Sequence, residues 1–158
     1  MHKKESTMGR RCAVAALLVM VAAWLGFAAD VAAEPSADRS AIEAVMRGTW
    51  DRPDARLLID PVVIVADYAV AGWSQGDMGG RALLRRKGQV WAVILCSGDG
   101  IKSADALRHA GLTVADAERL ARDLAEAERA LPPARLALFA KFEGTVMMDE
   151  TGHAHARK

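Results

Sequence analysis

The first strongly apolar run of the chain lies near its N-terminus, between residues 12 and 29. Basic residues precede this run, and the small residues Val31, Ala32 and Ala33 follow it. A positive segment, an apolar segment and small residues, in that order, are typical of a secretory signal peptide. An uncleaved membrane anchor is the alternative, because about 18 apolar residues are just enough to cross a bilayer. We expect residues 1–33 to be a cleavable signal peptide and the mature chain to act outside the cytoplasm.

After this leader, the apolar positions follow the period of an amphipathic helix. Ile42, Val45 and Met46 recur at helical spacing, and the segment Ser40 to Glu43 has the form of a capping box. A helix is therefore predicted over residues 38–47. The next residues, 50–60, contain a proline and several charges, and we expect them to form a connecting loop.

Between residues 61 and 96 the pattern changes to that of β-strands. Runs of β-branched and apolar residues alternate with glycine and charged residues. The four predicted strands span residues 62–65, 69–74, 81–86 and 89–96. Gly76–Gly80 is predicted to be a loop, and Lys87-Gly88 the two-residue turn of a hairpin. These segments predict a small antiparallel sheet of about four strands.

The rest of the chain returns to helical spacing. A short helix is predicted over residues 103–110, and a longer one follows a second capping box that begins at Thr113. Pro132 and Pro133 end this helix, and a last helix carries Phe139. A helix, a sheet and a further block of helices, in that order, predict an α+β fold.

The predicted elements define the domain organisation. We expect a single α+β domain over residues 34–143, because its elements follow one another with short connections. From residue 144 onward the periodicity is lost and the composition becomes polar. Residues 144–158 are therefore predicted to form a polar tail that contains methionine and histidine.

Composition narrows the classes of function. Apolar residues make up 52% of the chain and charged residues 26%, so a packed globule is expected. The formal net charge is +1, which gives no basic surface of the kind that nucleic-acid binding requires. Removal of the leader leaves one cysteine, Cys96, so the mature chain cannot form an internal disulfide. This thiol is either buried and inert, a metal ligand, or bonded to another chain.

The predicted hairpin suggests a first metal site. With Lys87-Gly88 as the turn, Gly79 lies opposite Cys96, and Met78 comes to the same edge of the sheet. Thiolate and thioether sulfurs are soft ligands suited to Cu(I), so Met78 and Cys96 are candidate ligands. The alternative is that the glycines and aspartates at this edge simply form tight turns.

The C-terminal segment supplies a second candidate site. Met147 and Met148 are followed within nine residues by His153 and His155, in a stretch too polar to pack. Methionine favours Cu(I), whereas imidazole binds Cu(II), zinc or nickel. One alternative is a frayed terminus with incidental histidines, and another is that Met147 and Met148 close over the core.

We find no motif of a known catalytic class in the sequence. It contains no nucleophile elbow, zinc-protease motif, phosphate-binding loop or Cys-x-x-Cys pair. Cys96 and His109 are a conceivable nucleophile and base, but the sequence alone does not bring them together. We therefore expect a protein that is not an enzyme.

Several segments of the mature chain resemble one known family. They span residues 60–73, 75–80, 81–86, 95–100, 107–111 and 142–149. Together they are similar to the copper uptake system-associated proteins of proteobacteria. The resemblance implies a periplasmic protein whose genes accompany copper transport components. It also implies a histidine-rich C-terminus, of which His153 and His155 are a short version.

Three functions remain open at this point. The first is a periplasmic accessory protein that binds copper, Cu(I) rather than Cu(II), and delivers it to an inner-membrane copper transporter. The second is an interaction module that regulates a transporter without binding metal. The third is a small-ligand binder with a pocket between helix and sheet, lined by Trp50 and Trp73. Metal stoichiometry separates the first from the others, and an apolar pocket in the structure favours the third.

Overall fold

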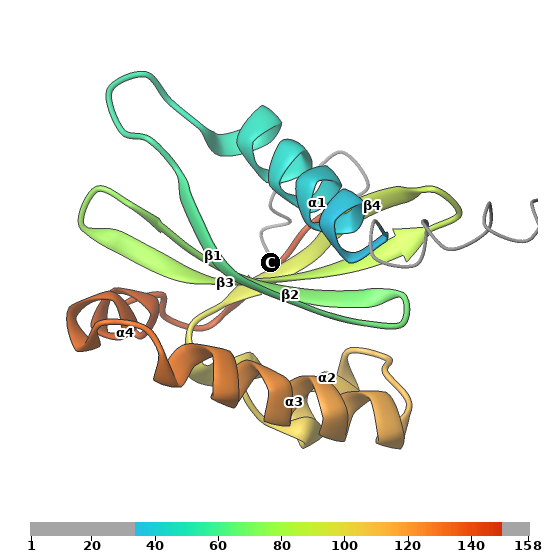
Figure 1. Cartoon of the computed structure of the whole chain (residues 1–158). Coiled ribbons are helices and arrows are strands. Elements are labelled where there is room, and N and C mark those ends of the chain that lie inside the picture. Colours follow the sequence, from blue (N-terminus) through green and yellow to red (C-terminus); the bar gives the residue numbers. More distant parts are fainter. Residues whose placement is uncertain (1–33, 150–158) are drawn as a thin grey trace, which may run out of the picture. The chain divides into compact units, whose positions relative to one another are not determined.

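A computed structural model describes residues 34–149 of the chain (Figure 1). The expected leader at residues 1–33, together with His153 and His155, lies outside this range. The elements in chain order are α1 (Glu34–Trp50), β1 (Leu58–Val65), β2 (Tyr68–Gln75), β3 (Met78–Lys87), β4 (Val90–Ser97), the short 3-10 helix η1 (Asp99–Ile101), α2 (Ala104–His109), α3 (Val114–Arg129), α4 (Pro133–Phe139) and β5 (Thr145–Met147). The predicted α+β fold is confirmed.

The strands form one antiparallel sheet in sequence order, β1-β2-β3-β4-β5. Tight turns join the first four strands, and in two of them a glycine with positive φ comes first: Gly76 at 62° and Gly88 at 63°. Glycine has no Cβ to clash in this conformation, which favours it at the first central position of such hairpins. The sheet has five strands rather than about four, because residues 145–147 pair with β4.

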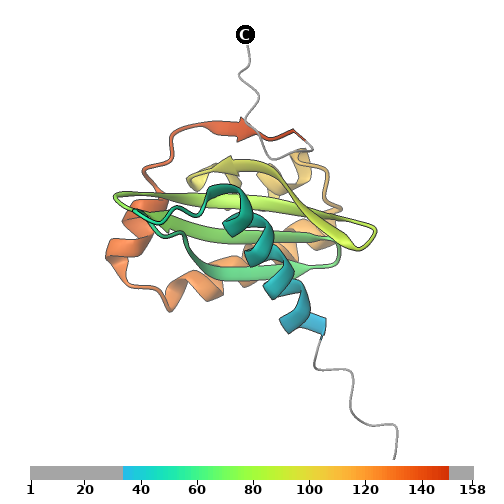
Figure 2. The ribbon, with the colours of Figure 1, turned by 90° about the horizontal axis from the view of Figure 1, so that it is seen from above.

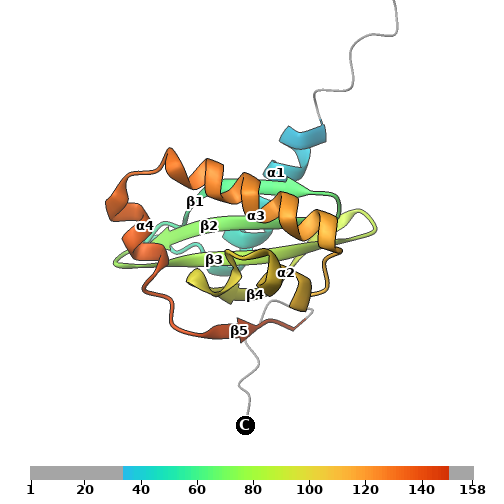
Figure 3. The ribbon, with the colours of Figure 1, turned by 90° about the horizontal axis from the view of Figure 1, so that it is seen from below.

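The helices form a layer on each face of this sheet. Helix α1 covers one face, and α2, α3 and α4 cover the other (Figures 1, 2 and 3). Each layer buries its own cluster of apolar side chains. Ile42 and Met46 of α1 pack on Ala71, Leu84 and other residues of the first face. The alternating residues of the same strands, with Leu120 and Leu124 of α3, form the second cluster.

Polar contacts at one side chain fix the first turns of α1 to the sheet. The Asp38 carboxylate accepts hydrogen bonds from Trp91 Nε1 and from Arg86 Nη1, each at 3.0 Å. The Arg86 guanidinium also lies over the Trp91 ring, 4.9 Å from its centroid. Arg86 therefore takes part in the docking of this helix. These contacts set the position of α1 over the sheet.

A buried ion pair joins the sheet to the opposite helical layer. The Arg81 side chain is 1% exposed, and its Nε and Nη2 donate to the Glu128 carboxylate at 2.6 and 2.9 Å. Its Nη1 donates to the Gly98 carbonyl and to the Asp99 carboxylate, both at 3.0 Å. The guanidinium also lies 5.2 Å from the centroid of the Phe139 ring. One side chain thus ties β3 to α3, to α4 and to the loop after β4.

Gly72→Ala is expected to lower the free energy of unfolding by about 1–3 kcal/mol. A Cβ at Gly72 would lie 2.8 Å from two ring atoms of Phe139 and 2.9 Å from Pro61 Cδ, so helix α4 would have to move away from β2. Urea denaturation measures the change. Gly48→Ala in α1 is the control: its Cβ meets no atom within 4 Å, and a gain of about 0.5–1 kcal/mol is expected there. Equal stability of both variants would contradict the packing of α4.

Several predicted boundaries are wrong. Helix α1 begins at Glu34 and continues to Trp50, so Ser40 lies within the helix and does not cap it. Strand β1 begins at Leu58, inside the predicted loop 50–60, and β3 begins at Met78, so Gly79 and Gly80 are strand residues. By contrast, the hydroxyls of Ser103 and Thr113 accept hydrogen bonds from the N–H groups of Ala106 and Asp116, as caps of the predicted kind.

The predicted register of the β3–β4 hairpin is also wrong. Its turn is Gly88-Gln89 rather than Lys87-Gly88, because Gly88 takes the first central position, where φ is positive. A β-bulge between Leu83 and Leu84 shifts the pairing once more. As a result, Cys96 lies opposite Ala82 and not opposite Gly79.

Candidate functional site

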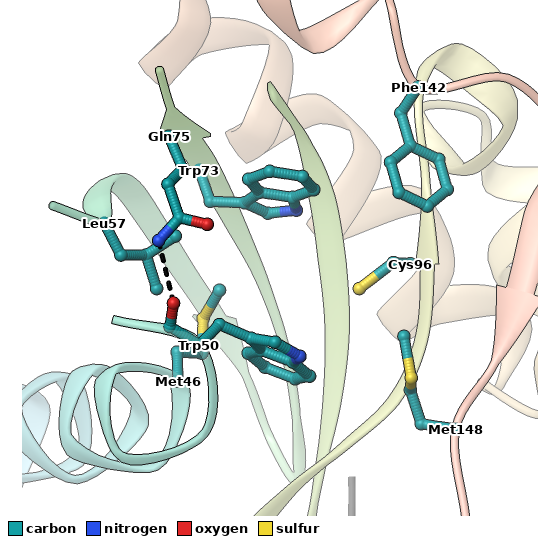
Figure 4. Close-up of a pocket in the computed structure, with 8 residues that line it drawn as sticks. All are labelled: Met46, Trp50, Leu57, Trp73, Gln75, Cys96, Phe142 and Met148. Atoms are coloured by element: carbon teal, nitrogen blue, oxygen red, sulfur yellow. Dashed lines mark hydrogen bonds between the residues drawn. The ribbon is translucent and has the colours of Figure 1, made fainter. Parts of the chain in front are cut away.

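An apolar cavity of about 220 Å³ lies between α1 and the sheet (Figure 4). Side chains from distant parts of the chain line it: Met46 and Trp50 from α1, Leu57 before β1, Trp73 and Gln75 from β2, Cys96 from β4, and Phe142 and Met148 from the segment after α4. The cavity therefore depends on both ends of the described domain. Gln75 is the one polar side chain in this set, apart from the Cys96 thiol and the two indole N–H groups.

Two aromatic residues form the wall of the cavity beside β3. Trp73 lies opposite Gly80 in the β2–β3 pairing, and a Cβ at Gly80 would lie 3.0 Å from Trp73 Cζ2. The glycine thus lets the indole lie across β3 toward β4. Phe142 meets the indole edge to face, with ring centroids 5.9 Å apart and planes at 83°. This contact holds Phe142, which follows α4, in the cavity wall.

The side chains of Gln75 and Asp51 form hydrogen bonds that hold the cavity wall at the end of α1. Gln75 Nε2 donates to the carbonyls of Trp50 and Ala55, at 2.7 and 2.8 Å (Figure 4 shows the first of these). Asp51 accepts from the Leu57 N–H at 2.7 Å and from Arg56 Nη1 at 2.8 Å. These two bonds lower the pKa of the Asp51 carboxyl, the backbone N–H of Leu57 first. The loop from Asp51 to Leu57 is therefore fixed at the cavity rim.

Three sulfur atoms line the cavity, from α1, β4 and the chain after β5. They belong to Met46, Cys96 and Met148 (Figure 4). Met46 is 1% exposed and Cys96 is 5% exposed, and the Met148 N–H donates to the Ile94 carbonyl at 3.0 Å, which extends the pairing of β5 with β4 by one residue. Burial raises the pKa of the Cys96 thiol to about 12, so the thiol is protonated near neutral pH. A soft metal that binds here must displace that proton.

The structure separates Met78 from the other candidate ligands. Met78 is 43% exposed at the start of β3, whereas Cys96 lies opposite Ala82, four residues further along that strand. Four residues of strand span roughly 13 Å, and the side chain of Cys96 turns into the cavity. The two residues proposed as one site at the sheet edge are therefore not brought together.

Of the two candidate methionines near the C-terminus, only one lies in the cavity. Met147 is 37% exposed and pairs with Leu95 on the face of the sheet away from α1, while its neighbour Met148 lines the cavity, because alternate residues of a strand face opposite sides. Residues 145–147, expected to belong to a polar tail, form a strand of the sheet. Met46 was missed as a candidate ligand. Its helical spacing marked it as a core residue, and only the fold shows that this part of the core adjoins Cys96.

The conceivable pair of Cys96 and His109 is excluded by the fold. His109 ends α2, where its Nδ1 lies 2.7 Å from the Asp105 carbonyl, and α2 belongs to the helical layer on the other face of the sheet. Cys96 packs in the cluster under α1. Within residues 34–149 there is also no group of three or more His, Cys, Asp or Glu side chains placed to hold a metal ion.

The chain was compared with known protein families, curated proteins and solved structures. No family model, curated sequence or solved structure matches it. None of the helices between residues 34 and 149 is long and apolar enough to cross a membrane.

Proposed function

We propose that the protein is a periplasmic accessory protein of copper uptake, which binds Cu(I) and delivers it to an inner-membrane copper transporter. One observation carries this proposal: the sulfur atoms of Met46, Cys96 and Met148 line a single cavity. The resemblance to copper uptake system-associated proteins supports the choice of metal. The proposal assigns no catalytic step to the chain.

The chemistry of the cavity selects a soft cation. Thioether and thiolate sulfur bind Cu(I) well, whereas Mg²⁺ and Ca²⁺ require oxygen ligands that these side chains lack. Trp50 and Trp73 flank the sulfur atoms and reduce the access of water to a bound ion (Figure 4). Two thioethers and one thiol offer fewer ligands than a closed site of four, and this suits a carrier that must release its cargo.

Cys96→Ala is expected to weaken Cu(I) binding at least tenfold, because the thiolate is the one anionic ligand of the three. Met46→Leu and Met148→Leu each remove a thioether at nearly constant volume, and a severalfold loss is expected for each. An anaerobic competition titration with a chromogenic Cu(I) chelator, on the purified protein, measures these affinities.

Two control variants locate the site. Met78→Leu removes an exposed thioether outside the cavity and should leave the affinity unchanged. A truncation after Asp149 removes His153 and His155 but keeps β5 and Met148 in place. Loss of binding in this truncation alone would move the site to the tail, and no stoichiometric binding by the intact protein would reject the carrier function.

A further inference from the structure

The cavity is larger than a metal ion needs. Its volume is about 220 Å³, whereas an engineered apolar cavity of about 150 Å³ already binds benzene, which has six non-hydrogen atoms. Scaling by volume gives room for a molecule of about nine non-hydrogen atoms. Three sulfur ligands around one ion would use only part of this space.

The walls of the cavity determine which molecule would fit. Methionine, leucine and aromatic side chains supply nearly all of the lining, and none of the lining residues is charged. A charged ligand would lose its hydration without gaining an opposite charge, so a neutral apolar body is favoured. Sulfur and aromatic groups make favourable contacts with an aromatic ring, which further favours a ligand that contains one.

One buried polar atom in the cavity wall lacks a hydrogen-bond partner. Trp73 Nε1 is buried from solvent and makes no hydrogen bond to any of the residues that the structure describes. In Figure 4 this nitrogen lies on the edge of the indole that faces Cys96. The amide nitrogen of Gln75 is engaged with two carbonyls, and Trp91 Nε1 is bonded to Asp38. A buried N–H without an acceptor is unfavourable, and a ligand that supplies the acceptor removes this cost.

We infer that this cavity binds a small neutral molecule with an aromatic or similarly apolar body and one hydrogen-bond acceptor, which accepts from Trp73 Nε1. The acceptor fixes the orientation of the ligand, and Trp50, Met46 and Met148 enclose its apolar part. This function goes beyond copper delivery and requires no metal. An apolar pocket is the feature expected of a small-ligand binder, and the N–H of Trp73 would give this pocket specificity for ligands that carry an acceptor.

Acetophenone and α-methylstyrene test this inference, because they have the same shape and nine non-hydrogen atoms each. They differ at one position, where acetophenone has a carbonyl oxygen and α-methylstyrene has a methylene group. Both are titrated into the purified, isotope-labelled protein in the presence of a copper chelator, and indole N–H resonances are followed by NMR. Acetophenone is expected to bind about tenfold more tightly, since one hydrogen bond to an otherwise unpaired donor has that effect. It should also shift one indole resonance that α-methylstyrene leaves nearly unchanged.

Two variants assign the effect to its donor. Trp73→Phe keeps an aromatic wall but removes the N–H, so the preference for acetophenone should fall to about one. Trp91→Phe removes an indole that does not line the cavity, and the tenfold preference should persist. If Trp73→Phe does not fold, the resonance that shifts in the unmodified protein still decides the outcome. Binding of neither compound, or equal binding of both, would overturn the inference whether or not the protein binds Cu(I).

Discussion

Glu128→Leu is expected to lower the free energy of unfolding by about 3–5 kcal/mol. The substitution leaves the guanidinium of Arg81 in a site where 1% of its side chain is exposed, without the carboxylate that accepts two of its hydrogen bonds. Asp99 remains as a partner, but its side chain is 63% exposed, so it compensates little. Urea denaturation followed by far-UV circular dichroism measures the loss.

The double variant Arg81→Met with Glu128→Leu separates two explanations of this loss. If the penalty comes from an uncompensated buried charge, removal of both partners should restore much of the stability, and the double variant should exceed either single variant. Asp99→Asn is the matched control at the exposed end of the network, with an expected change of no more than about 1 kcal/mol. A double variant less stable than both single variants would show that the ion pair itself stabilises the fold.

Cys96 is expected to react with a disulfide reagent such as Ellman's reagent about fiftyfold more slowly in the folded protein than in urea. Burial raises the pKa of this thiol from 9.0 to about 12, so its thiolate fraction near neutral pH falls about a thousandfold. The greater nucleophilicity of a more basic thiolate offsets part of this decrease, and about fiftyfold remains. Stopped-flow absorbance at pH 7.5, with the protein folded and unfolded, gives the two rates.

Cys96→Ala supplies the background rate for any other thiol in the preparation. Leu57→Ala tests whether burial causes the slow reaction of Cys96, because this variant removes a buried side chain from the cavity wall and admits water. Its rate should rise toward the unfolded value. A folded protein that reacts as fast as the unfolded one would show that Cys96 is not buried in solution, and the cavity as described would then be wrong.

The sequence predicts the elements of this fold better than their ends. Helical spacing and side-chain caps located α2 and α3, because both signals are local. The start of β1 was missed, since the charged residues before Leu58 are typical of a loop. The three residues of β5 were missed because so short a strand has too few residues to show alternation, and only its pairing with β4 defines it.

The cavity could not be predicted, because its residues are brought together only by tertiary contacts. Cys96 and Met148 were both candidate ligands, yet the sequence assigned them to different sites. The predicted turn at Gly88 was one residue out of position, and the bulge in β3 was not predicted. These two errors placed Cys96 opposite Gly79, and therefore beside Met78, in the predicted sheet. Met46 joins the set through the packing of α1, which no local pattern reports. The sequence therefore grouped the candidate ligands with the wrong neighbours, and whether they bind a metal stays a prediction.

The small size of β5 has a consequence for how the cavity opens. This strand pairs with β4 over three residues, while β2 and β3 pair over eight. Separation of β5 from the sheet therefore requires far less free energy than unfolding of the four-stranded meander. Such a local opening displaces Met148 from the cavity wall and exposes Cys96, while α1 and the other helical layer stay in place. A molecule that binds in the cavity, as proposed above, would then enter and leave by detachment of the last strand alone.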